Sequence, residues 1–131
     1  MTVQFAVARR GIPGAASFRR WALAAGSSDL NVRIVGEREG RRLNAQFRNK
    51  SRATNVLSFE TGDVVLCHPV IRREARTQRK SLRAHYAHLV VHGVLHLRGY
   101  AHGTGAQARR MERAEIRILR RFGFADPYTI E

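Results

Sequence analysis

Four histidines lie at helical spacing in one stretch of the chain. They are His85, His88, His92 and His96, separated by intervals of three, four and four residues. Residues at these intervals lie above one another on a helix, and most positions between them are apolar. An imidazole in apolar surroundings needs a partner for each ring nitrogen, because an unpaired buried polar group is unfavourable. A divalent metal ion is one such partner, since it binds the ring lone pair directly.

The last two of these histidines, together with His102, are the predicted metal ligands. His92 and His96 are four residues apart, a spacing at which two helical side chains can bind one ion. Gly99 favours the left-handed conformation that ends a helix, and the reversed chain would return His102 to the same ion. Three histidine ligands leave a fourth position open, which is typical of catalytic zinc sites. The two earlier histidines are expected to be structural, or to support the ligands without binding the metal.

The same residues have the spacing of the long zinc-peptidase motif, but a peptidase is not the predicted activity. In that motif a glutamate directly follows the first histidine and acts as the base for the attacking water. Gly93 occupies this position. The chain therefore lacks the peptidase base, although a metal ion can by itself lower the pKa of a bound water to about 7.

Positive charge greatly exceeds negative charge in this chain. Lysine and arginine number 24 against 10 acidic residues, which gives a formal net charge of +14. Such a field attracts polyanions and speeds their encounter with the protein. Nucleic acid is therefore the predicted partner, and an acidic membrane surface is the alternative. Arginine supplies nearly all of the charge, so a coding bias toward arginine is a third explanation that needs no ligand.

Length and composition indicate a single domain that spans residues 1–131. A chain of 131 residues is long enough to bury about two-thirds of its unfolded surface. The single cysteine, Cys67, excludes an internal disulfide and fits a reducing compartment. No apolar run reaches transmembrane length, and the first residues lack the apolar segment of a secretory signal. We therefore expect a cytoplasmic protein with no membrane partner.

Hydrophobic periodicity and turn residues predict the elements that must position the histidines. Strands are expected at Val3–Val7, Leu30–Val35, Asn55–Phe59 and Asp63–Cys67, the last two as a hairpin. Helices are expected at Ser17–Ala25, Glu37–Arg48, Pro69–Gln78, Leu82–Leu97 and Thr104–Phe122. Ser81 is the expected N-cap of the helix that carries the histidines.

The stretch from His92 to His102 resembles the H-G-x-L-H-L-x-G-Y-D-H signature of the YbeY-type endoribonucleases, the bacterial rRNA-maturation factors. The resemblance extends beyond this motif, and the matches follow the family order over most of the chain. The further matches are Thr54–Phe59, Gly62–Cys67, Met111, Glu115, Gly123 and Asp126–Tyr128.

The resemblance implies a fold and an activity. The fold would be α+β, a single domain in which a small mixed β-sheet packs against helices and the central helix binds metal. The activity would be that of a zinc-dependent endoribonuclease with one zinc ion per chain and a preference for single-stranded RNA. Its partner would be the small ribosomal subunit, in rRNA maturation and ribosome quality control. The oligomeric state is left open.

The resemblance also assigns site residues by position. His92, His96 and His102 would be the zinc ligands. Arg48 would be the catalytic arginine that the family carries ahead of the block matched here by Thr54–Phe59. An arginine beside the ion can hold a phosphate through two parallel hydrogen bonds and stabilise the charge that develops on it.

One position departs from the family signature. Ala101 stands where the family has aspartate, and its methyl group cannot accept a hydrogen bond from an imidazole or a water. Metal binding should survive on three histidines, and Glu60 or Asp63 in the predicted hairpin could supply the missing carboxylate. The alternative function is a zinc-containing rRNA- or ribosome-binding factor that has lost activity. A third is a metal-dependent hydrolase of another anionic substrate.

Overall fold

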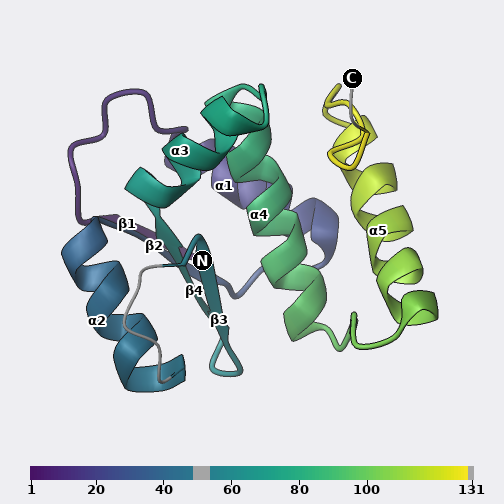
Figure 1. Cartoon of the computed structure of the whole chain (residues 1–131), viewed down its shortest axis with the longest axis horizontal. Coiled ribbons are helices and arrows are strands. Elements are labelled where there is room, and N and C mark those ends of the chain that lie inside the picture. The colour runs from purple at the N-terminus through teal and green to yellow at the C-terminus, as the bar shows by residue number, and fades with distance from the viewer. Residues whose placement is uncertain (49–53, 130–131) are drawn as a thin grey trace.

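The computed structural model describes residues 1–48 and 54–129, without the side chain of Arg48. These residues form one mixed sheet and a set of helices (Figure 1). The strands are β1 (Thr2–Phe5), β2 (Asn31–Val35), β3 (Val56–Phe59) and β4 (Asp63–Cys67). The helices are α1 (Ala15–Ala25), α2 (Glu37–Arg48), α3 (His68–Thr77), α4 (Leu82–Leu97) and α5 (Gly105–Arg120). The predicted α+β fold with a small mixed sheet is confirmed.

The sheet has the strand order β1-β2-β4-β3. Strand β2 pairs in parallel with both β1 and β4, whereas β3 and β4 run antiparallel. The predicted hairpin is therefore present, with Leu57 opposite Val65. Its turn contains Gly62 at a φ of +93°, a conformation that glycine adopts without the strain a side chain would bring.

Alternating residues of the central strands face two separate hydrophobic clusters, as the period of a strand requires. Val32 and Val64 pack into the larger cluster, which also contains buried residues of α1, α4 and α5. Val65 and Cys67 pack into the smaller cluster on the other face, against Leu43 of α2. Helix α2 therefore covers one face of the sheet, while the main core with α4 lies on the other.

Helix α4 lies between the sheet and α5 and carries the four histidines (Figure 1). It spans the predicted range, and the side chain of its N-cap Ser81 accepts a hydrogen bond from the Ala84 backbone N–H at 3.0 Å. At its other end the Tyr100 N–H donates to the Leu95 carbonyl at 3.0 Å, with Gly99 at a φ of +98°. This is a Schellman motif, so the predicted helix and its reversal at Gly99 are both confirmed.

Gly93 allows α4 to approach the sheet closely. A Cβ atom at this position would lie 3.1 Å from the Ser58 hydroxyl oxygen of β3 and 3.6 Å from methyl groups of Val64. Contacts of this kind force a neighbour to shift. The position at which zinc peptidases carry their catalytic glutamate is therefore used here for packing between helix and strand.

The boundaries of several predicted elements differ by one or two residues from those in the structure. Strand β1 ends at Phe5 instead of Val7, and Phe5, opposite Ile34 of β2, is its last paired residue. Helix α5 ends at Arg120 instead of Phe122. Helix α3 begins at His68, one residue before Pro69, and proline is accepted in a first helical turn because its missing N–H has no helical partner there.

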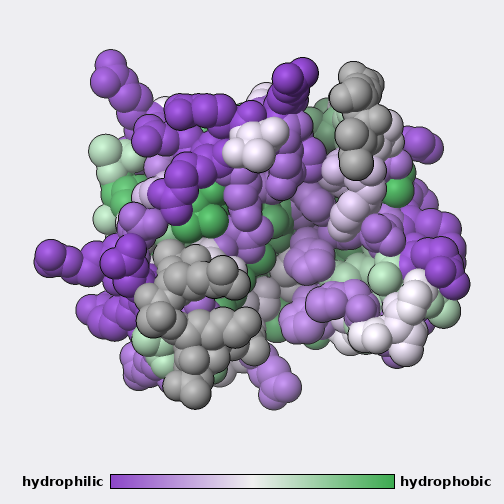
Figure 2. All heavy atoms as spheres, viewed as in Figure 1, coloured by the Kyte–Doolittle hydropathy of each residue, from purple (hydrophilic) through white to green (hydrophobic). Residues whose placement is uncertain are grey.

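The surface agrees with the composition of the chain. Hydrophilic side chains dominate the face shown in Figure 2, and hydrophobic atoms appear between them in separate patches. Within the described ranges, none of the helices combines the length and apolar character needed to cross a membrane.

Candidate functional site

The three predicted metal ligands lie together at the end of α4. The ring centroids of His92 and His102 are 5.8 Å apart, and those of His96 and His102 are 6.0 Å apart. The reversal at Gly99 thus returns His102 to the two histidines of the helix, as predicted. Tetrahedral zinc with nitrogens at about 2 Å would hold imidazole centroids about 5 Å apart.

The three rings must therefore come slightly closer to share one ion. Within residues 1–48 and 54–129, no group of three or more histidine, cysteine, aspartate or glutamate side chains is already arranged to hold a metal. The donor set nevertheless suits zinc, because three imidazoles on a helix and its exit turn form a common zinc-binding arrangement. Zinc binding stays a prediction.

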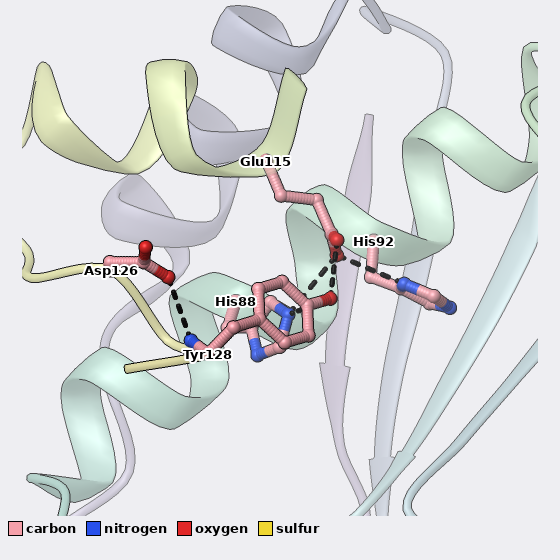
Figure 3. A network of polar contacts seen from close by, with 5 residues as sticks. All are labelled: His88, His92, Glu115, Asp126 and Tyr128. Atoms are coloured by element: carbon pink, nitrogen blue, oxygen red, sulfur yellow. Dashed lines mark hydrogen bonds and ion pairs between the residues drawn. The ribbon is translucent and has the colours of Figure 1, made fainter. Parts of the chain in front are cut away.

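A buried carboxylate lies directly behind this group. Glu115 of α5 has no exposed surface, and its side chain accepts hydrogen bonds from three residues (Figure 3). His88 Nε2 lies 3.1 Å and His92 Nδ1 3.0 Å from Glu115 Oε2. The Tyr128 hydroxyl donates to Glu115 Oε1. The Glu115 carboxylate therefore links α4, α5 and the segment that follows α5.

The electrostatics of this cluster define its protonation states. Burial by itself raises the pKa of the Glu115 carboxyl, but the hydrogen bonds from His88, His92 and Tyr128 outweigh it and lower that pKa to about 2. Burial lowers the pKa of His88, more than the neighbouring carboxylate raises it. Glu115 is thus an anion at neutral pH, and a neutral His88 donates to it through Nε2–H.

The contact with Glu115 selects one tautomer of His92. A carboxylate can only accept, so the Nδ1 of His92 must carry the proton. The lone pair of His92 is then on Nε2, which points away from Glu115 in Figure 3. This is the arrangement in which a carboxylate orients a metal-binding histidine.

His85, the first histidine of α4, contacts a different carboxylate. His85 is 3% exposed, and its Nε2 lies 2.9 Å from Glu74 Oε1 of α3. The Asn55 side-chain amide also donates to Glu74, at 3.0 Å. His85 therefore joins α4 to α3 and to the segment before β3, away from the three candidate ligands. The expected division of roles agrees with this geometry, since His85 is structural and His88 supports His92 through Glu115.

The two hairpin carboxylates named from the sequence lie in different places. Glu60 lines a cavity of about 460 Å³ together with His96. Asp63 lines a second cavity, which shares Phe47 and Phe59 with the first, and its Oδ2 accepts a hydrogen bond from the Thr61 hydroxyl at 2.6 Å. Of the two, only Glu60 shares a cavity with a candidate ligand. Ala101 itself is exposed.

Arg48, the predicted catalytic residue, is the last residue of α2. Its side chain lies outside the described residues, so its distance from the histidines is untested. The preceding residue, Phe47, lines the cavity that contains His96. The end of α2 therefore reaches the candidate site.

Sequence reasoning gave no role to Glu115 or Tyr128. One signal was available for Glu115, because it is a carboxylate on the apolar side of α5, among Met111, Ala114 and Ile118. A charged side chain in such a position is almost never buried without partners. For Tyr128 the signal was its place in the family match Asp126–Tyr128, since the irregular segment after the last helix gave no pattern of its own.

Three comparisons with known proteins agree with one another. The family model described as "Endoribonuclease YbeY" matches residues 15–123. A protein named Endoribonuclease YbeY from Nitrosomonas eutropha is 51% identical over 140 residues, which cover 100% of this chain and 99% of the relative. A protein with the same name from Aromatoleum aromaticum is 49% identical over 141 residues, which cover 98% of this chain and 92% of the relative. The solution structure of TM1509 from Thermotoga maritima has a TM-score of 0.60 at 21% identity, covers 98% of this chain and 99% of that one, and supports the fold.

Replacing Glu115 by glutamine should release His92 from its single tautomer. Glutamine has nearly the same shape but no charge, and its NH₂ group is a donor in place of one acceptor oxygen, so it cannot accept from His88, His92 and Tyr128 together as the carboxylate does. In long-range ¹H–¹⁵N NMR spectra of the metal-free protein, the neutral His92 ring should carry its proton on Nδ1. In Glu115→Gln the form protonated on Nε2 should become populated. Glu74→Gln is the matched control, because it changes the same kind of contact at His85. An unchanged His92 tautomer in Glu115→Gln would contradict this assignment.

Proposed function

The chain belongs to the Endoribonuclease YbeY family, and on that premise we propose that it is a zinc-dependent endoribonuclease that cleaves single-stranded RNA. We further propose that it acts in the cytoplasm on rRNA of the small ribosomal subunit, in rRNA maturation and ribosome quality control, without a membrane partner. The observation that carries the proposal is the meeting of three imidazoles at the end of α4, one of them oriented by the buried Glu115.

His92, His96 and His102 would hold the ion, one per chain. A zinc ion bound there would supply Lewis acidity near neutral pH. Glu115 keeps the lone pair of His92 on Nε2, and His88 helps to hold Glu115 in place. The protein residues thus pre-organise the ligands, so less ordering is needed when the metal binds.

The remaining steps require groups that contact the RNA. The net charge of +14 would draw a polyanion to the protein, and the guanidinium of Arg48 would hold the phosphate that is cleaved. Glu60 is the carboxylate that shares a cavity with His96. It is exposed, so it can exchange a proton with solvent and is the residue we assign to proton transfer.

One observation favours a second candidate function. Ala101 removes the aspartate of the family signature, and with it a carboxylate beside His102. A protein that binds zinc and rRNA but no longer cleaves RNA would keep the three histidines and lack this carboxylate. A cleavage assay on the zinc-loaded protein separates this binding factor from the enzyme.

His96→Ala should lose most of the bound zinc, because two histidines hold zinc far more weakly than three. The purified protein should carry about one zinc ion per chain, measured by elemental analysis and by competition with a chromophoric chelator. His85→Gln is the control, since glutamine retains an amide donor for Glu74 and the site should stay intact. Full zinc occupancy in His96→Ala would show that the ion is bound elsewhere.

Arg48→Ala should reduce cleavage of single-stranded RNA strongly while zinc content stays unchanged. Arg48→Lys should not restore the rate, because lysine keeps the charge but lacks the planar pair of donors that binds a phosphate through two hydrogen bonds. The rates are compared at equal zinc loading, with Arg38→Ala on the same helix as the charge-matched control. If Arg48→Ala cleaves as fast as the parent, Arg48 has no part in the reaction.

Ala101→Asp should bind zinc at least as tightly as the parent and cleave single-stranded RNA faster. A carboxylate beside a ligand histidine typically changes metal affinity or activity by about 10–100-fold, and the neighbouring turn is already formed. Both proteins are assayed at matched zinc loading, with His96→Ala as the blank. Equal rates would mean that another carboxylate, with Glu60 as the candidate, already replaces the aspartate. No cleavage by either protein would favour the binding factor.

A further inference from the structure

An aromatic pair lines the cavity that contains His96. Phe47 comes from α2 and Phe59 from β3, and both line this cavity of about 460 Å³. Their ring centroids are 5.2 Å apart with an interplanar angle of 75°. In this edge-to-face arrangement the edge of one ring contacts a face of the other, and the two rings stabilise each other. The pair is therefore a preformed aromatic surface beside a candidate metal ligand.

Phe47 is unusual in its exposure. It retains 53% of its accessible surface and is one of three large hydrophobic side chains in the described part of the chain that remain exposed, with Leu23 and Tyr128. Its partner Phe59 is partly buried against the small cluster beneath α2. Apolar surface left in water forgoes about 25 cal/mol per Å² of stabilisation. An exposed phenylalanine at a cavity wall is therefore suited to contact a ligand.

The chemistry of the cavity identifies the class of ligand. Glu60 lines it as well, and a carboxylate disfavours a phosphate or another anion at close range. An uncharged ring with polar edges suits both the phenylalanines and this carboxylate, because exocyclic amino groups of bases can donate to it. A nucleobase has these properties, and every base offers a π-face for stacking.

We propose that Phe47 and Phe59 form a stacking site for one nucleobase of single-stranded RNA, next to the phosphate that lies at the histidines. The inference rests on the proposed function, because it assumes RNA as the substrate. It also accounts for a preference for single strands, since a base must be unstacked and unpaired before it can enter such a site.

The test compares two short single strands of equal length and charge. One is an oligoadenylate, and the other carries the same backbone with every base removed. Binding to the full-length purified protein is measured by fluorescence anisotropy in the cold, and a denaturing gel checks that the strands stay intact. Phe47→Ala should weaken oligoadenylate binding by about 5- to 100-fold and leave binding of the abasic strand unchanged. Phe47→Trp should bind oligoadenylate at least as well as the parent.

Leu23→Ala is the matched control, because Leu23 is another exposed apolar residue, on α1, and it should change neither affinity. Equal affinity of Phe47→Ala and the parent for oligoadenylate would overturn the proposal, as would an equal loss for both strands. Loss of self-association in Phe47→Ala, seen by sedimentation velocity with unchanged RNA binding, would identify a subunit interface instead.

These experiments distinguish failure of the stacking site from failure of the proposed function. A parent protein that binds oligoadenylate through Phe47 but never cleaves RNA would refute the enzyme and support the stacking site. A parent protein that cleaves RNA and shows no difference between the two strands would refute the stacking site and leave the enzyme standing. Binding of neither strand would overturn the stacking site in either case.

Discussion

The buried charge of Glu115 is the constraint on which the candidate site depends. A carboxylate with no exposed surface is stable only if nearby groups replace the water it has lost, and leaving such a charge without partners costs several kcal/mol. Here the partners come from two turns of α4 and from Tyr128. Folding cannot satisfy Glu115 without bringing α4, α5 and the following segment together. The same contacts orient His92, so stability and site geometry depend on one group.

The packing of α4 against the sheet adds a second constraint. Gly93 allows the helix to approach β3 and β4, while His92, one residue earlier, faces Glu115. The helix thus packs tightly against the sheet at Gly93 and donates a hydrogen bond to a buried carboxylate at the preceding position. This arrangement limits rotation of α4 about its axis. The limited rotation keeps His92 and His96 on the side to which the chain returns with His102.

The parts that could be predicted from the sequence are those set by local physics. The helix that carries the histidines, its Ser81 cap and the reversal at Gly99 depend on residues within a few positions of one another. Glu115 is different, because it lies 23 residues from His92 in sequence and only tertiary packing brings the two together. The end of β1 at Phe5 also differs from the predicted end at Val7, since alternation of apolar residues does not show where pairing with the neighbouring strand stops. The family resemblance supplied roles for Arg48 and the histidines that spacing alone could not supply.

The two carboxylates near the histidines are suited to different tasks. Glu115 has no exposed surface, and its oxygens already accept three hydrogen bonds, so it is placed to act as a fixed acceptor. Its task is to orient His92. Glu60 has the opposite character, since it is exposed and lines the cavity that contains His96. The loss of an aspartate at Ala101 therefore cannot be offset by Glu115, whatever its proximity. In the proposed reaction Glu60 would take the proton, and the proposed stacking site of Phe47 and Phe59, which line the same cavity, would place a base next to the reacting phosphate.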